Sequence, residues 1–105
     1  MKNIVIARDF SKTPFGRYIS DSPNSAERFR REFLVPALQN GNEQLVVDFR
    51  GAMGVGSSFL EEAFGGLVRR EDVAKGDLKK RLIIHSDMPY YKELIERFID
   101  QATPA

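Results

Sequence analysis

The feature that most constrains the fold is residues 45–68, where a short apolar run leads through a glycine-rich loop into a helical pattern. The run Leu45-Val46-Val47-Asp48-Phe49 is rich in β-branched side chains and bounded by polar residues, as in a central parallel strand buried on both faces. The apolar residues that follow the loop recur at helical spacing, at Phe59, Leu60, Ala63, Phe64, Leu67 and Val68. A strand followed closely by an amphipathic helix predicts an α/β fold.

Two serines mark the expected start of this helix. Ser57 or Ser58 is the natural N-cap, because its hydroxyl can accept a hydrogen bond from a free backbone N–H in the first turn. If Ser58 is the cap, Glu61 stands three residues further on and completes a capping box. Glu61 and Glu62 also place negative charge near the positive end of the helix dipole.

The loop 51–58 allows three interpretations. In the first, glycines permit the turn, a serine caps the helix and nothing binds. The second is a phosphate site, but the Walker A pattern needs a Lys where Ser57 stands, and the dinucleotide fingerprint needs a glycine where Phe59 stands. In the third, a serine is a phosphorylation switch, because a hydroxyl at a helix start is exposed and preorganised to hold a phosphoryl group.

The segment before this core predicts a hairpin and a helix. Residues 4–7 have the pattern of a strand, and residues 16–20 are its expected hairpin partner. A helix then begins near residue 26, with Asn24 and Glu27 as its capping-box pair. Pro36 removes an internal hydrogen bond from this helix, so we expect a kink or a looser turn at its end.

The remaining segments alternate between polar connections and apolar elements. Residues 40–42 close the first helix, and the charged residues 71–80 form an exposed loop. A buried strand over 81–85 precedes a last helix that opens at Pro89, with Asp87 as its cap. The resulting order is β-β-α-β-α-β-α, a mixed sheet of about four strands with about three helices that cover at least one face.

Length and composition are those of one small domain over residues 1–105, with 42% apolar residues. The 16 basic and 15 acidic residues give no basic face, so we expect no nucleic-acid partner. The chain has no cysteine and one histidine, which favours neither a disulfide nor a metal site, and we expect no cofactor. No signal peptide and no apolar run of about 20 residues is evident, so we expect a cytoplasmic protein without a membrane partner.

Asp48-Phe49, the short loop, Ser57-Ser58 and the apolar helix together resemble the core of a STAS domain, the fold of the bacterial anti-sigma-factor antagonists. In that family a D-S-S-G-L segment opens the corresponding helix, and a partner kinase phosphorylates its first serine. Residues 56–60 occupy this segment, with Gly56 in place of the Asp. The resemblance therefore implies Ser57 as the phospho-acceptor, and we keep Ser58 as a second candidate.

Nearly the whole chain is similar to the bacterial STAS-like family of unknown function. The residues that carry this likeness are Phe10-Ser11, Gly16-Arg17, Pro36, Val47-Asp48-Phe49 and the run Ser57-Ser58-Phe59-Leu60-Glu61-Glu62-Ala63-Phe64-Gly65. The resemblance implies a small regulatory or interaction module, often found near histidine-kinase-like ATPases, without an established activity.

These observations predict a docking surface at the carboxyl ends of the strands, where contacts form in open α/β sheets. We expect a protein partner, such as a histidine-kinase-like ATPase, to bind the loop and the start of the following helix. Met53 and Val55 are apolar loop residues that we expect to be partly exposed there. The predicted partner-binding residues are Met53, Gly54, Val55, Gly56, Ser57, Ser58, Glu61 and Glu62. Asp48 is predicted to be a structural carboxylate that steadies the loop.

Two alternatives belong to other classes. The first is a small hydrolase with Ser57 as nucleophile, His85 as base and Asp87 as orienting acid. The chain lacks the G-x-S-x-G elbow and has little room for a substrate pocket, so we predict that the protein is not an enzyme. The second is a homo-oligomeric scaffold that associates through an edge strand and has no phospho-switch.

Overall fold

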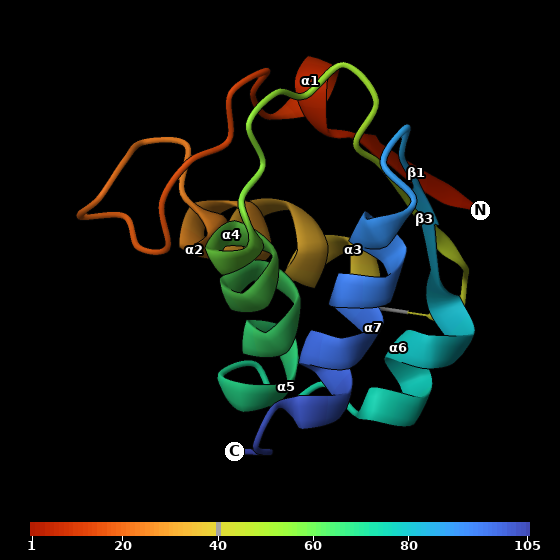
Figure 1. Ribbon diagram of the computed structural model, residues 1–105. Helices are drawn as coiled ribbons and strands as arrows, with labels where there is room; N and C mark the ends of the chain where they lie inside the picture. Colours follow the sequence, from red (N-terminus) through yellow and green to blue (C-terminus); the bar gives the residue numbers. More distant parts are fainter. Residues whose placement is uncertain (40) are drawn as a thin grey trace.

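The computed structural model describes residues 1–39 and 41–105, and its central element is a three-strand parallel sheet (Figure 1). The strands are β1 (Lys2–Val5), β2 (Leu45–Asp48) and β3 (Leu82–His85), in the order β1-β2-β3. Ile4, Val47 and Ile84 are direct partners in the register. Asn40, part of the turn expected at 40–42, lies outside the described residues.

The expectation of a mixed sheet of about four strands is wrong. Residues 16–20 form bends and turns, and their backbone holds the start of the first long helix instead of pairing with β1. The N–H of Ala26 donates to the carbonyl of Gly16, and the N–H of Glu27 donates to that of Arg17, both at 2.9 Å. With the hairpin absent, helical crossovers join all three strands, and the sheet is parallel throughout.

The described chain has five helical segments rather than the expected three. The first is the single turn α1 (Ile6–Asp9), which takes over the end of the predicted first strand. Two longer helices each contain a π-helical turn: α2 (Ala26–Phe29), η1 (Arg30–Leu34) and α3 (Val35–Leu38), then α4 (Ser57–Leu60), η2 (Glu61–Gly65) and α5 (Gly66–Arg69). The last two are α6 (Lys75–Arg81) and α7 (Tyr90–Gln101). None of these helical segments of the described chain is both long and apolar enough to span a membrane.

The segment predicted as an exposed charged loop contains α6. Leu78 is its one apolar anchor and is fully buried. Arg81, at the end of the helix, donates from its guanidinium to the carbonyls of Glu43 and Leu38, at 2.9 and 3.0 Å. One leucine and one buried arginine therefore fix a helix whose other side chains face solvent, which is why its hydrophilic sequence resembled a loop.

The helices pack against one face of the sheet, and the opposite face carries no helix in the described chain (Figure 1). The packed face contributes Ile4, Leu45 and Val47 to the core, where they meet Phe64, Leu67 and Ile95 among others. The open face carries Val5, Val46 and Ile83 in its middle, and polar residues around them. Val46 is nevertheless only 5% exposed, so β2 is buried on both faces, as expected, although no helix of the described chain covers the open face. Successive right-handed crossovers in the order β1-β2-β3 place every connection on the same side.

Candidate functional site

The loops that leave β2 and β3 meet at the carboxyl end of the sheet and border a hollow of about 280 Å³. A hydrogen bond of 2.8 Å from the N–H of Phe49 to the carbonyl of His85 joins the two loops at their base. The hollow is lined by Phe49, Gly51, Ala52, Met53, Gly54, Ser86, Asp87, Met88 and Tyr91. Met53 is 66% exposed and Met88 is 48% exposed. Two flexible methionines and two aromatic rings thus surround an opening that is mainly apolar.

The loop from 51 to 56 is held in place at several points. Gly51 and Gly54 have φ values of +89° and +68°, which side-chain-bearing residues rarely adopt. The N–H of Met53 donates to the carbonyl of Lys12 at 2.8 Å, so the segment after α1 supports the loop. The hydroxyl of Tyr91 donates to the carbonyl of Val55 at 3.3 Å. The loop therefore presents the Met53 side chain from a fixed backbone.

The structure separates the predicted partner-binding residues into two groups. Gly54, Gly56, Ser57 and Ser58 are exposed, as Met53 is. Val55 is only 7% exposed and belongs to the core, so the expectation of its exposure is wrong. An apolar residue beside two glycines resembled a surface residue in the sequence, but its side chain turns inward and anchors the loop.

The capping predictions for three helices are wrong. Gly56 is the N-cap of α4, with an extended backbone and no side chain to accept a hydrogen bond, and the two serines are the first helical residues. For α2 the cap is Ser25, whose hydroxyl accepts from the N–H of Arg28 at 3.2 Å. Pro89 occupies the cap position of α7. The exposed hydroxyls of Ser57 and Ser58 consequently have no capping role.

Glu61 and Glu62 belong to a group of seven ionic side chains that we call the charge cluster. Its members are Arg17, Arg30, Glu61, Glu62, Arg69, Arg70 and Glu71. Arg30 and Glu62 are each 1% exposed and lie 2.9 Å apart, and a second nitrogen of Arg30 lies 2.8 Å from Glu71. Glu62 also accepts from Arg69 and Arg70 at 3.2 and 3.1 Å. Glu62 is thus enclosed and cannot contact a partner unless the cluster opens.

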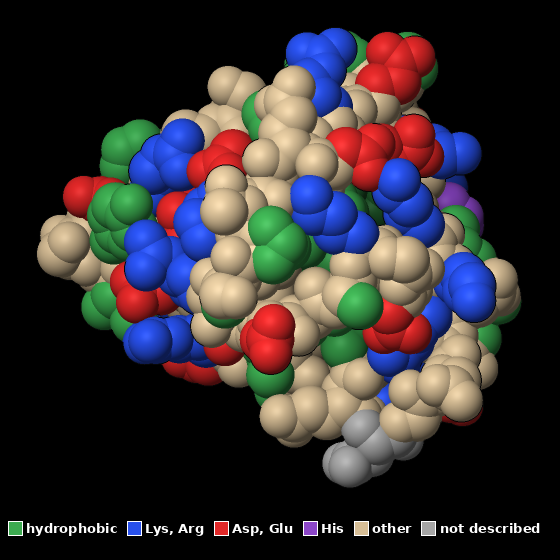
Figure 2. Space-filling model, turned by 90° about the horizontal axis from the view of Figure 1, so that it is seen from below, with side chains coloured by type: hydrophobic (Ala, Val, Ile, Leu, Met, Phe, Trp, Pro, Cys, Tyr) green, Lys and Arg blue, Asp and Glu red, His purple; other side chains and the backbone are tan. Residues whose placement is uncertain are grey.

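Glu61 lies nearer the surface of the charge cluster. It accepts hydrogen bonds from Arg17 at 2.7 Å and from Arg69 at 2.8 Å. Burial raises the pKa of Glu61, but the hydrogen bonds from Arg69 and Arg17 outweigh burial, and the pKa lies below its ordinary value. Seen from the C-terminal side, acidic and basic side chains are intermixed, without a large area of one sign (Figure 2).

Two adjacent glycines, Gly65 and Gly66, make room for this cluster. A Cβ at Gly66 would lie 2.5 Å from a guanidinium nitrogen of Arg30. A Cβ at Gly65 would lie 2.7 Å from a carboxylate oxygen of Glu61. Because adjacent glycines are costly inside a helix, the pair within an otherwise helical pattern was the available signal of a close approach.

Asp48 lies at the carboxyl end of β2, where its carboxylate binds Arg50. It accepts from the backbone N–H of Arg50 at 2.9 Å and from the guanidinium at 2.9 and 2.7 Å. Hydrogen bonding by Arg50 is the largest cause of the lowered pKa of Asp48, and the neighbouring His85 also lowers it. This contact fixes Arg50, the second residue after the strand, two residues before Ala52.

The residues of the hydrolase alternative lie on different elements. Ser57 begins α4, whereas His85 and Asp87 border a shallow hollow together with Arg50 and Ser86. Among the described residues no hydrogen bond connects Ser57 to His85 or His85 to Asp87. Across 1–39 and 41–105, no group of three or more His, Cys, Asp or Glu side chains could hold a metal ion.

Comparison with known proteins gives one match. The sequence profile of the STAS-like domain of unknown function (DUF4325) matches residues 25–92, from the cap of α2 to the first turn of α7. No curated protein and no solved structure matches the chain. The matched segment spans well over half of the chain and contains β2, the loop 51–58 and the charge cluster except Arg17. The chain therefore belongs to the family of STAS-like domains of unknown function.

Proposed function

We propose that this STAS-like domain is a regulatory protein-interaction module that docks a partner protein over the loop 51–58 and the start of α4. The observation that carries the proposal is the exposed Met53 beside the apolar hollow at the carboxyl end of the sheet. Contacts in open α/β sheets form at this end. The family relationship supports a regulatory module rather than a catalyst.

The hollow suits an apolar anchor from a partner protein. Phe49 and Tyr91 form part of its lining, with ring centroids 5.3 Å apart. Met53 and Met88 at its border can adjust to the shape of an inserted side chain, because methionine has no branch and three rotatable bonds. Binding energy in such interfaces concentrates in a few residues that fill well-formed pockets. We therefore assign the main contact to Met53 and the hollow, with Gly54 and Gly56 allowing close backbone approach.

A phosphorylation switch fits the two serines at the start of α4. Ser57 and Ser58 are exposed, and neither caps the helix, so a modifying enzyme could reach them without unfolding α4. A phosphoryl group adds roughly −1.5 to −2 charges and is stabilised at the N-terminus of a helix. At the edge of an apolar contact the same charge would weaken docking. The partner we propose is a histidine-kinase-like ATPase, which would also phosphorylate Ser57.

The proposal is tested by a pull-down from a lysate of the source cell, read by mass spectrometry that reports both partners and phosphorylated sites. The baits are the wild-type protein, Ser57→Asp, and Ser20→Asp as a matched control on an exposed turn away from the hollow. We expect wild type and Ser20→Asp to retain the same regulator, Ser57→Asp to lose it, and phosphate to be found on Ser57. Equal retention by all three baits, with unmodified serines, would remove the switch from the proposal.

The docking surface itself needs a second variant. Met53→Asp places a charge beside the hollow and should abolish retention of the partner whether or not a switch exists. Because Met53 is exposed, this variant should unfold at the same urea concentration as wild type. If Met53→Asp retains the partner in full, the partner docks elsewhere and the proposal fails.

A further inference from the structure

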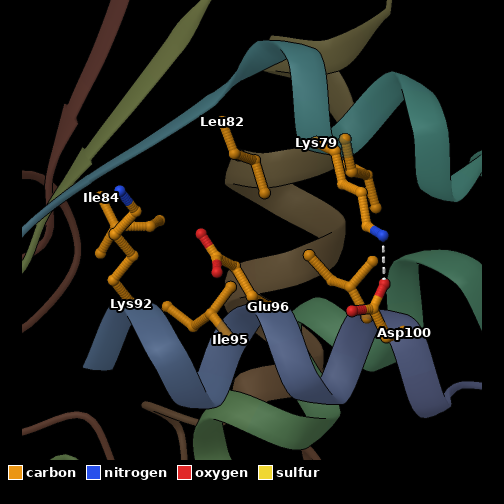
Figure 3. A pocket seen from close by; sticks show the side chains of 9 residues that line it. Lys79, Leu82, Ile84, Lys92, Ile95, Glu96 and Asp100 are labelled. Carbon is orange, nitrogen blue, oxygen red and sulfur yellow. Dashed lines mark ion pairs between the residues drawn. The ribbon is translucent and has the colours of Figure 1, made fainter. Parts of the chain in front are cut away.

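The edge of the sheet at β3 carries a second groove, remote from Ser57. It lies between β3 and α7 and has a volume of about 310 Å³ (Figure 3). Leu82 and Ile84 of the strand face Ile95 and Ile99 of α7 across it. The groove exists because the sheet ends at β3, which leaves the layer between the sheet and α7 open at its side.

β3 is an edge strand without the features that normally prevent pairing. It pairs with β2 on one side only, so the peptide groups on its other side lack a strand partner within the described chain. Leu82, Ile83 and Ile84 are half-buried, and the strand has no Lys, no Pro and no bulge. Such an edge binds extended chains by adding a strand.

The opposite edge, at β1, is more polar and is partly occupied. The first two residues of β1 are Lys2 and Asn3, and Asn3 is exposed. The N–H of Val5 donates to the carboxylate of Asp9 at 2.8 Å, so a side chain already uses one of the backbone groups of β1. A partner that binds by adding a strand to the sheet is therefore expected at β3 and not at β1.

The β3 edge is complementary to itself. Leu82 and Ile84 point to the groove, and Ile83 points to the open face of the sheet, because side chains alternate along a strand. If a second copy runs antiparallel, with the two Ile83 residues opposite each other, Leu82 of each copy lies opposite Ile84 of the other. Apolar side chains then meet on both faces of the joined sheet. Each residue lies opposite a residue whose side chain points to the same face.

The unpaired charges along the groove suit the same two-fold arrangement. Lys92 lies at the Ile84 end, whereas Glu96 points into the groove between Ile84 and Leu82 (Figure 3). Lys79 and Asp100, at the Leu82 end, are paired with each other. Lys92 and Glu96 are exposed and have no ion-pair partner in residues 1–39 and 41–105. A two-fold rotation about Ile83 would bring Lys92 of a second copy to the Leu82 end, on the side where Glu96 of the first copy is unpaired.

We propose that two copies of this chain associate through β3 into a two-fold symmetric dimer with one continuous sheet. The pairing is antiparallel about Ile83, and each groove is completed by the strand of the other copy and by Lys92–Glu96 ion pairs between copies. This inference locates the edge of self-association and is independent of the proposed docking loop. The contact is small, so we expect a dissociation constant between about 10 µM and 1 mM.

Sedimentation equilibrium of the purified full chain, from about 10 µM to about 1 mM, tests the dimer. We expect the average mass to rise toward twice that of the monomer. Ile83→Lys puts two like charges opposite each other and should weaken association about tenfold or more. Asn3→Lys is the matched control, because Asn3 lies in the same register row at the other edge, and it should dimerise like wild type.

Two charge reversals identify the ion pairs. Lys92→Glu and Glu96→Lys should each dimerise more weakly than wild type, because each homodimer then contains two like-charge contacts. An equimolar mixture of the two variants should recover a dimer, since each heterodimer contact joins opposite charges. Mass spectrometry under non-denaturing conditions distinguishes the heterodimer from both homodimers if one variant is isotope-labelled.

Several results would overturn the proposal. A chain that stays monomeric to about 1 mM does not use this edge for self-association. A dimer that is equally sensitive to Asn3→Lys, or insensitive to Ile83→Lys, has its interface elsewhere. No preference for the heterodimer in the mixture contradicts the antiparallel register about Ile83. None of these results depends on the docking partner, whose loss in the pull-down would leave the dimer unaffected.

Discussion

The charge cluster and the loop 51–58 adjoin along the chain but use their polar residues in opposite ways. In the cluster, Glu61 and Glu62 are each bound by more than one arginine, and the pair Arg30–Glu62 is almost fully enclosed. In the loop, the hydroxyls of Ser57 and Ser58 are exposed and do not cap α4. The most strongly charged segment is therefore structural, and the uncharged serines remain available for a partner or a modifying enzyme.

The contacts of a side chain within the fold, more than its charge, therefore decide whether it is free to act. A buried charge is tolerated only when opposite charges and hydrogen bonds surround it, so its removal affects the whole fold. An exposed loop residue without such partners can change with little cost to stability. Substitutions in the two regions should accordingly separate into effects on unfolding and effects on binding.

The largest effect is expected for Glu62→Ala. This change removes the buried carboxylate partner of Arg30 and leaves only the partly exposed Glu71 beside it, and breaking a buried pair costs about 3–5 kcal/mol. Urea unfolding followed by circular dichroism measures the loss. The double variant Arg30→Met/Glu62→Leu removes both charges and should recover most of the stability. A loss below about 1 kcal/mol for Glu62→Ala would mean that the charge cluster contributes little to the stability of the fold.

The next largest effect is expected at the glycine pair. Gly66→Ala brings a Cβ against the Arg30 guanidinium and should cost about 1–3 kcal/mol, because the buried arginine has little room to move. Gly76→Ala in α6 is the matched control, since nothing lies within 4 Å of its new Cβ. Alanine there should stabilise the protein by about 0.5–1 kcal/mol. Equal effects of the two changes in urea unfolding would contradict the close contact at Gly66.

Acid should weaken the charge cluster, because the pKa of Glu61 is lowered in the folded state. The folded-state pKa of Glu61 lies below its ordinary value of 4.5, so its contribution is fully present above that pH and is lost as the pH falls through the lowered folded-state value. Unfolding free energies at about pH 7 and about pH 3 should therefore differ more for wild type than for Glu61→Gln. Asp48, with its pKa lowered by Arg50, still titrates in the variant, so some acid sensitivity remains. A variant that is as acid-sensitive as wild type would exclude Glu61 as a contributor.

The sequence predicted the elements built from apolar periodicity and missed those fixed by distant contacts. The strand at 45–48, the helix from 57 and the strand at 82–85 follow from local patterns and are present. The hairpin strand at 16–20 is absent because its carbonyls bind the start of α2, 10 residues further on, which no local pattern encodes. The helix α6 was missed because one buried leucine and one buried arginine hold it in place.

The candidate site shows the same division. The position of the loop and of the serines follows from the order of strand, glycines and helix. The burial of Val55 and Glu62 does not, because it depends on Tyr91 and Arg30, 36 and 32 residues away. In the sequence pattern of this helix, Glu62 is a polar residue outside the apolar stripe, as on a solvent-exposed side. Only the packing of α2–η1–α3 against the helix shows that this side is enclosed.

The smallest effect, and the sharpest test of the loop, is expected for Ser58→Ala. If Ser58 capped α4, its loss would cost about 1 kcal/mol, as for other helix caps. Because Gly56 is the cap and Ser58 lies within the helix, we expect a change within about 0.5 kcal/mol, since alanine favours helix at exposed positions. Ser25→Ala is the internal reference: Ser25 is fully buried and caps α2, so its loss should cost at least about 1 kcal/mol in the same urea titration. Equal losses for the two variants would mean that Ser58 has a structural role after all, and the phospho-switch would then compete with the stability of α4. A loss confined to Ser25→Ala would mean that the hydroxyl of Ser58, like that of Ser57, does not contribute to the stability of the fold. A modification site at this position requires this condition.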